Sequence, residues 1–214
     1  MSAVVFDLDG TLLHSAPDVL DALSQALQEN NLVCGVPMTE QIIGPPVQDM
    51  LIQLGFGSDP AVLAHVVASF RRVYDASAMP LTYPYPGAVA LLQDLQAQGR
   101  RVYLATHKPL APTLALENRF FPGLIEDIRC TDSIPGRHLS KTGMLQELAA
   151  HHSLVSEQTV MVGDGVGDIV AGKALGWMTI AVGWGYGTHA QLKAERPDHL
   201  VAEVSELHCI LGRR

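Results

Sequence analysis

The sequence predicts an α/β fold whose core is a parallel sheet and whose second part is a small inserted cap made only of helices. Two observations carry this prediction. Short apolar stretches typical of buried strands alternate with helical patterns in the first 14 residues and again after residue 82. Between them, helical patterns and turns follow one another without any strand-like alternation. We therefore expect a core formed by residues 1–14 and 82–214, and a helical cap formed by residues 15–81.

The first predicted strand ends in two aspartates. Apolar residues 4–6 run directly into Asp7, and Asp9 follows two residues later. Open α/β sheets bind their ligands at the carboxyl ends of the strands, and Gly10 permits a tight turn at this point. Because two carboxylates this close repel each other, a cation or a proton is expected beside them. Acidic turns are common, so a bare pair of this kind would favour a simple role in capping the next helix, and the later segments must decide.

The predicted cap begins with a helix and contains a proline turn. Ser15 and Asp18 have the spacing of a capping box, and leucines then repeat at helical spacing. Further along, Gly44 and Pro45 lie in a turn at residues 43–46, between two short helical patterns. Such a turn can simply break a helix or can face a substrate, and the residues alone favour neither interpretation.

The next predicted strand, at residues 101–105, ends in a hydroxyl and a base. Thr106 closes this strand, and His107 and Lys108 follow it. A hydroxyl at a strand end, beside the start of a helix, is a natural contact for an anion. After a weaker strand at residues 125–130, Arg137 and Lys141 lead into another helix. Lysines in such positions are usually solvated, so the residue types alone assign these bases no function.

The last polar segment follows an apolar strand at residues 159–162. It contains three glycines together with Asp164 and Asp168. The glycines do not have the G-x-G-x-x-G spacing of a dinucleotide site, and Asp164 would repel a pyrophosphate unless a cation stood between them. The three glycines let the backbone approach another group closely at this point.

These four polar segments, in this order, resemble the four motifs of the haloacid dehalogenase-like superfamily of phosphohydrolases. The D-x-D-G-T-L string after the first strand and the G-D-x-x-x-D string at residues 163–168 are the most specific matches. The resemblance covers nearly the whole chain and implies a Rossmann-like core. The turn at residues 43–46 and a glycine-aromatic loop at residues 183–188 are similar to segments of phosphoglycolate phosphatase-like members.

The resemblance implies a role for each reactive residue. Asp7 would be the nucleophile that becomes a phosphoaspartate, and Asp9 would act first as an acid and then as a base. Mg²⁺ would be bound by the Asp7 and Asp164 side chains and the Asp9 carbonyl, while Asp168 would support these ligands or bind through a metal-bound water. Thr106 and a lysine would hold the phosphoryl group, and Lys141 is preferred over Lys108. The candidate substrate contacts are Gly10, Gly44, Pro45, Thr106, His107, Lys108 and Arg137; His107 stands where the family more commonly has asparagine.

The resemblance leaves three functions open. A Mg²⁺-dependent phosphatase acting on phosphoglycolate or other small metabolite phosphates is preferred, because dehalogenase and phosphonatase relatives lack an acid at the position of Asp9. A sugar phosphomutase is the first alternative, although the turn at residues 43–46 has no arginine of the kind that mutase caps usually carry. A regulatory or binding protein that has lost its chemistry is the second, and all five reactive positions are filled.

Composition and charge limit the partners. The 214 residues carry a formal net charge of −8, which argues against a nucleic-acid or anionic-membrane surface. No apolar run approaches the ~18 residues of a membrane helix, and the first residues lack the pattern of a signal peptide. Three cysteines far apart, Cys34, Cys130 and Cys209, suit free thiols in the cytoplasm. A monomer and a homodimer both agree with the sequence.

Overall fold

The predicted α/β fold with a parallel sheet is confirmed by a computed structural model, which describes residues 1–212. A six-stranded sheet has the order β5-β4-β1-β6-β7-β8, and every neighbouring pair in it is parallel. Its strands are β1 (Ala3–Phe6), β4 (Arg101–Thr106), β5 (Asp127–Cys130), β6 (Thr159–Gly163), β7 (Met178–Val182) and β8 (His199–Val201). The first strand in the sequence is therefore a central strand in space, with β4 on one side and β6 on the other.

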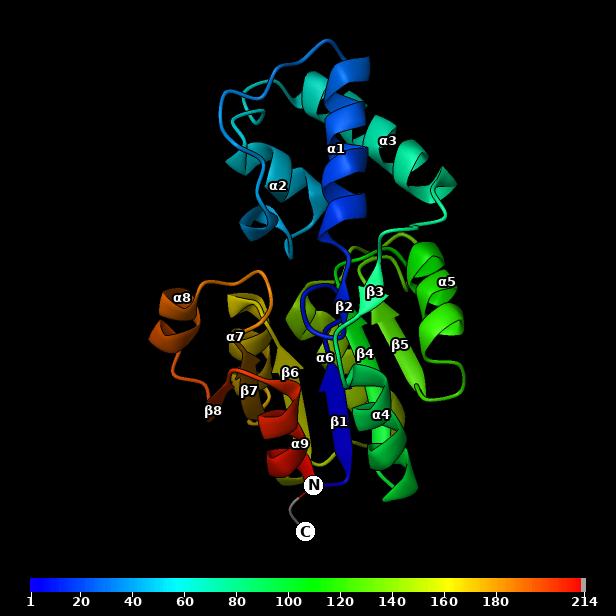
Figure 1. The fold of residues 1–214 in the computed structure, drawn as a ribbon, viewed down its shortest axis with the longest axis vertical. Coiled ribbons are helices and arrows are strands. Elements are labelled where there is room, and N and C mark those ends of the chain that lie inside the picture. The colour runs from blue at the N-terminus through cyan, green and yellow to red at the C-terminus, as the bar shows by residue number, and fades with distance from the viewer. Residues whose placement is uncertain (213–214) are drawn as a thin grey trace.

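Alternation along the central strands creates two apolar layers. Val4 and Phe6 of β1 belong to one buried cluster together with Leu92, whereas Val5 belongs to a second cluster together with Leu145. Helices α4 (Ala88–Ala97) and α9 (Val204–Gly212) thus cover one face of the sheet, and α6 (Lys141–His152) and α7 (Val166–Ala174) cover the other (Figure 1). The remaining helical elements of this part of the chain are α5 (Leu110–Phe120), η2 (Ser156–Gln158) and α8 (His189–Ala194).

The helices between residues 15 and 81 gather above the carboxyl edge of the sheet (Figure 1). They are α1 (Ala16–Glu29), the 3₁₀ turn η1 (Glu40–Ile42), α2 (Val47–Gln53) and α3 (Pro60–Ala76). Leu23, Val66 and Phe70 are buried between α1 and α3. The Asp59 carboxylate accepts hydrogen bonds from the Ala61 and Val62 amides and so caps the start of α3.

A short antiparallel pair joins the two parts of the chain. Its strands are β2 (Leu13–His14) and β3 (Tyr83–Pro84), and they pair Leu13 with Pro84 and His14 with Tyr83. The chain therefore leaves the sheet and returns to it at the same point. We keep the name cap for residues 15–81, whose exact bounds stay a prediction.

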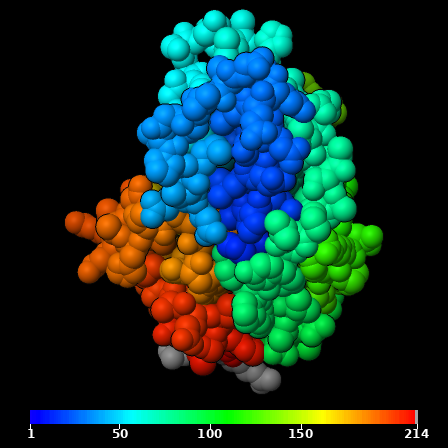
Figure 2. Space-filling view, turned by 45° about the horizontal axis from the view of Figure 1, so that its top comes forward, coloured from blue at the N-terminus to red at the C-terminus, as the bar shows by residue number. Residues whose placement is uncertain are grey.

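Three further observations bear on the sequence predictions. Within residues 1–212, no helix has both the length and the apolar character needed to cross a membrane. Cys34, Cys130 and Cys209 are all free thiols, as expected. On the face seen in Figure 2, the light-blue part of the cap lies against the orange segment of the core.

Candidate active site

The site forms where three neighbouring strands end. Asp7 directly follows β1, Thr106 is the last residue of β4, and Asp164 directly follows β6. The Asp7 amide donates a hydrogen bond of 2.9 Å to the Val162 carbonyl, which extends the β1–β6 ladder to the aspartate itself. Asp7 and Thr106 are 99 positions apart in the sequence, and Thr106 and Asp164 are 58 apart. Because β1 lies between β4 and β6, the three side chains nevertheless reach the same edge.

Three buried carboxylates form an acidic cluster at this edge. Asp7, Asp164 and Asp168 are each no more than 6% exposed, and one ligand oxygen from each lies within 4.8 Å of the others. Their orientations are fixed by neighbours: Asp164 accepts hydrogen bonds from the Thr11 hydroxyl at 2.9 Å and the Tyr186 amide at 2.7 Å. Asp168 accepts one from the Gly165 amide at 3.0 Å.

Lys141 inserts its ammonium group into this cluster. Its Nζ lies 2.6 Å from Asp7 Oδ1, 2.8 Å from Asp168 Oδ1 and 2.7 Å from the Ala105 carbonyl oxygen. Burial lowers the pKa of the Lys141 ammonium, but the charges of Asp168 and Asp7 outweigh burial, and the net effect is a raised pKa. The lysine therefore stays charged while it is buried.

One ammonium does not balance three carboxylates. Burial is the main cause that raises the pKa of Asp7, and the Asp168 charge adds to it against the opposing effect of Lys141. Burial and Asp168 likewise raise the pKa of Asp164 to about 7. Convergent oxygen ligands with excess negative charge are what Mg²⁺ prefers in proteins, so the residues present fit the predicted cation. The side chain of Asp9 is not part of this group.

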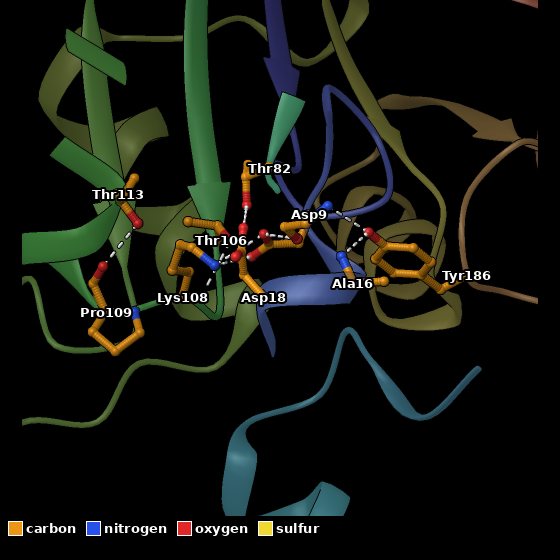
Figure 3. Close-up of polar contacts among 10 residues, drawn as sticks. Asp9, Ala16, Asp18, Thr82, Thr106, Lys108, Pro109, Thr113 and Tyr186 are labelled. Carbon is orange, nitrogen blue, oxygen red and sulfur yellow. Dashed lines mark hydrogen bonds and ion pairs between the residues drawn. The ribbon is translucent and has the colours of Figure 1, made fainter. Parts of the chain in front are cut away.

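Asp9 points the other way, to a second lysine. Lys108 Nζ lies 3.0 Å from both Asp9 carboxylate oxygens (Figure 3). The Ser15 hydroxyl donates a hydrogen bond to Asp9 Oδ1. Burial lowers the pKa of the Lys108 ammonium, but the Asp9 charge outweighs it and the pKa is raised. The two candidate lysines thus have separate partners, Lys141 with Asp7 and Lys108 with Asp9.

The remaining predicted residues differ in how close they lie to the site. Thr106 is 1% exposed, and its hydroxyl accepts a hydrogen bond from the Lys108 amide. Gly10 adopts φ +86°, and a Cβ built there would lie 2.2 Å from Asp164 Oδ2, so only a glycine leaves room for the Asp164 carboxylate here. Gly10 lines neither of the two pockets described below. Arg137 is not brought to the site: its exposed side chain faces Glu147 at 3.6 Å.

His107 connects the core to the cap. Its Nδ1 lies 3.1 Å from the Gly44 carbonyl oxygen. A carbonyl can only accept, so Nδ1 carries the proton of this bond. Burial, aided by the charge of Lys141, lowers the pKa of His107 to about 4, and the ring is neutral at pH 7.

Two spaces meet at this contact. The inner pocket, of about 80 Å³, is lined by Asp9, Thr106 and Lys108 and by residues of α2 and α3. The outer channel, of about 560 Å³, is lined by Lys141, Asp164 and Asp168 and by segments of the cap and the core around α8. Both spaces share six lining residues: Asp7, Ile43, Gly44, Pro45, Pro46 and His107.

Residues at the start of the cap were assigned the wrong partners by sequence reasoning. Ser15 and Asp18 do not form a capping box: the Ser15 hydroxyl donates to Asp9, and Asp18 accepts from the Thr82 hydroxyl at 2.7 Å. The Ser15 and Ala16 amides instead donate to the Tyr186 hydroxyl, at 2.8 and 2.9 Å (Figure 3). Nothing local predicts this, since Tyr186 comes from the glycine-aromatic loop at the other end of the chain.

The fold and the acidic cluster at the strand ends agree with membership of a hydrolase family. The family model of haloacid dehalogenase-like hydrolases matches residues 1–176, and the chain belongs to this family. It is 36% identical to the phosphoglycolate phosphatase of Cereibacter sphaeroides, over 100% of this chain and 99% of that protein.

Solved structures share this fold. The structure of Mycobacterium tuberculosis Protein Tyrosine Kinase A (PtkA) is similar with a TM-score of 0.81 and 30% identity, over 99% of this chain and 98% of that one. A predicted phosphatase from Clostridium acetobutylicum has the same fold, with a TM-score of 0.88 and 24% identity, over 98% of this chain and 97% of that one.

Proposed function

We propose that this hydrolase is a Mg²⁺-dependent phosphatase that hydrolyses small phosphate monoesters through a phosphoaspartate on Asp7. One observation supports this most directly. Two aspartates in the same turn have different partners, because Asp7 faces Lys141 in the acidic cluster and Asp9 faces Lys108 outside it. A nucleophile and a proton-transfer group need this kind of separation.

In the first step, Asp7 attacks the phosphorus in line with the ester oxygen. A bond between an Asp7 oxygen and the phosphorus forms as the bond to the ester oxygen breaks. Asp9 enters this step protonated, the form that the second step regenerates, and delivers its proton to the ester oxygen. In the second step, Asp9 takes a proton from water, whose oxygen attacks the phosphorus and releases Asp7. Lys141 and the Thr106 hydroxyl stabilise the charge on the phosphoryl oxygens in both steps.

The acidic cluster would hold the cation. Asp7 and Asp164 would provide side-chain oxygens, the Asp9 carbonyl would provide a third ligand, and Asp168 would support them. Bound there, Mg²⁺ would supply a fixed positive charge against the phosphoryl oxygens. We also propose that residues 15–81 act as one cap, in which Gly44 and Pro45 form part of the substrate's surroundings, because both line the two spaces beside Asp7.

The similarity to phosphoglycolate phosphatases supports phosphoglycolate, or a metabolite phosphate of similar size, as the substrate. Sugar phosphate mutation and loss of catalysis remain alternatives with distinct outcomes. A mutase would move phosphate between sugar carbons with little release of inorganic phosphate, and an inactive protein would turn over no ester at all.

The purified protein, tested on a panel of metabolite phosphates and on p-nitrophenyl phosphate, should release inorganic phosphate. EDTA should abolish this activity and Mg²⁺ should restore it. Asp7→Asn should form no phosphoenzyme under rapid quench, although the protein still folds. Full activity without metal, or a phosphoenzyme in Asp7→Asn, would contradict the proposal.

A further inference from the structure

The two spaces beside Asp7 differ in their access to the proton-transfer group. Asp9 lines the inner pocket but not the outer channel. If Asp9 protonates the ester oxygen, as the proposed function requires, the leaving group must lie where Asp9 can reach that oxygen. The inner pocket is therefore the space that receives the leaving group, and the larger outer channel is not.

The inner pocket is the narrower of the two spaces. The room that it leaves for the centre of a water-sized group is about 80 Å³, against about 560 Å³ in the outer channel. Much of its wall is apolar and comes from the cap, with Val19, Met50 and Phe70 among the lining residues. A chain of two or three carbons suits this narrower space better than a nucleoside or a hexose does.

One polar side chain of the cap lies in this wall with no acceptor for its hydroxyl proton among the described residues. Tyr74 of α3 is 3% exposed and stacks on Phe70, with ring centroids 5.5 Å apart. Its hydroxyl has no hydrogen-bond partner among the described residues. The nearby Lys108 ammonium, 4.7 Å from the centroid of the Tyr74 ring, is itself a donor and cannot accept the phenol proton. Burying a hydroxyl without an acceptor costs free energy, and a ligand oxygen that accepts its hydrogen bond would remove this cost.

The charged residues around Tyr74 indicate which chemical group of a ligand would accept this hydrogen bond. Burial raises the pKa of Tyr74 against the effect of Lys108, so the phenol keeps its proton and donates. Two cations and three carboxylates line this pocket: Lys108 and Arg71, the latter an exposed residue of α3, against Asp7, Asp9 and Asp75. Lys108 is already paired with both Asp9 oxygens, so Arg71 is the cation placed to meet a ligand oxygen beside Tyr74. An oxygen acceptor, and a carboxylate where Arg71 takes part, matches these two donors.

We propose that Tyr74 is a specificity-determining residue, whose hydroxyl donates a hydrogen bond to an oxygen at the far end of a two- or three-carbon leaving group. The preferred substrates are then short phosphate esters that end in a carboxylate. Arg71 reinforces the contact from the same helix. The cap selects the substrate by a bond at the end remote from the phosphate, and the core performs the chemistry.

Three esters with the same two-carbon skeleton test this role: 2-phosphoglycolate, 2-hydroxyethyl phosphate and ethyl phosphate. We expect kcat/KM to fall in that order for the unmodified chain. In Tyr74→Phe, the ratio of kcat/KM for 2-phosphoglycolate to that for ethyl phosphate should fall roughly 10- to 100-fold, the usual effect of losing a hydrogen bond to a charged group. Tyr83→Phe, a matched change at an exposed tyrosine outside the inner pocket, should leave the ratio as it was.

The outcomes separate this inference from the proposed function. If no ester is turned over by the unmodified chain, the proposed function itself fails. If esters are turned over but the Tyr74→Phe ratio stays within twofold of the unmodified ratio, the role of Tyr74 is wrong. Efficient turnover of a nucleoside monophosphate by the unmodified chain would show that the leaving group does not occupy the inner pocket. Thermal unfolding of Tyr74→Phe verifies that the variant is folded.

Discussion

The two aspartates of one turn belong to halves of the site that are built differently. The half around Asp7 consists of core residues only, with Lys141 at the start of α6 and two aspartates after β6. The half around Asp9 also uses the cap, because Ser15 donates to Asp9 and the Tyr74 ring lies under Lys108. If Asp7 accepts the phosphoryl group and Asp9 transfers the proton, as proposed, then phosphoryl binding needs core residues alone, whereas proton transfer depends on where the cap lies.

The largest expected effect comes from removing the lysine of the Asp7 half. Lys141→Met leaves Asp7 and Asp168 without their common ammonium partner. We expect kcat to fall roughly 10²–10³-fold, the usual result of losing one electrostatic contact to the transition state. The loss should be similar for p-nitrophenyl phosphate and for alkyl phosphates, since Lys141 transfers no proton. A loss that grows with the pKa of the leaving group would contradict the separation of the two halves.

A smaller effect is expected from the lysine of the Asp9 half. Lys108→Met removes the cation that holds both Asp9 oxygens. For alkyl phosphates we expect a loss of roughly 10- to 100-fold, at the low end of what acid–base catalysis contributes. For p-nitrophenyl phosphate, whose leaving group needs little protonation, the loss should be several times smaller. Steady-state kinetics on esters of graded leaving-group pKa measure this difference, which should be absent in the exposed-lysine control Lys173→Met.

The smallest expected effect is on the pH dependence of stability, and it comes from His107, whose ring contacts the Gly44 carbonyl between the two spaces. His107 has a pKa of about 4 in the folded chain and an ordinary value of 6.5. Between these values the unfolded chain binds a proton that the folded chain does not, so the stability that neutral His107 contributes is lost as pH falls from 6.5 to 4. The Tm of the unmodified chain should therefore drop more than that of His107→Asn, by roughly 2–4 °C between pH 7 and pH 5.

Calorimetry of the two proteins at several pH values gives this comparison. Carboxylates elsewhere in the chain titrate in the same pH range in both proteins, so the difference between the two curves of Tm against pH isolates the effect of His107. Parallel curves would show that the His107 ring is protonated as easily in the folded chain as in the unfolded one.

The sequence predicts the core half of the site better than the cap half, for a physical reason. Asp7, Thr106 and Asp164 each end an apolar strand, and in a parallel sheet this local pattern already fixes a common edge. Tyr74 follows Phe70 at helical spacing and looks like a core residue, because the missing partner of its hydroxyl is visible only in three dimensions. Similarly, the sequence around Ser15 is typical of a helix cap, but in the structure the Tyr186 hydroxyl, and not the Ser15 side chain, accepts a hydrogen bond from an amide at the start of the helix.

The Tyr186 hydroxyl has a consequence for the order in which the chain acquires its structure. It is the acceptor for the first amides of α1, yet 171 residues separate Tyr186 from Ser15. During synthesis, which proceeds from the N-terminus, α1 emerges long before its acceptor exists. The first helix of the nascent chain therefore begins with unsatisfied amides, and its start is completed only when the last third of the protein has left the ribosome and docked on the sheet.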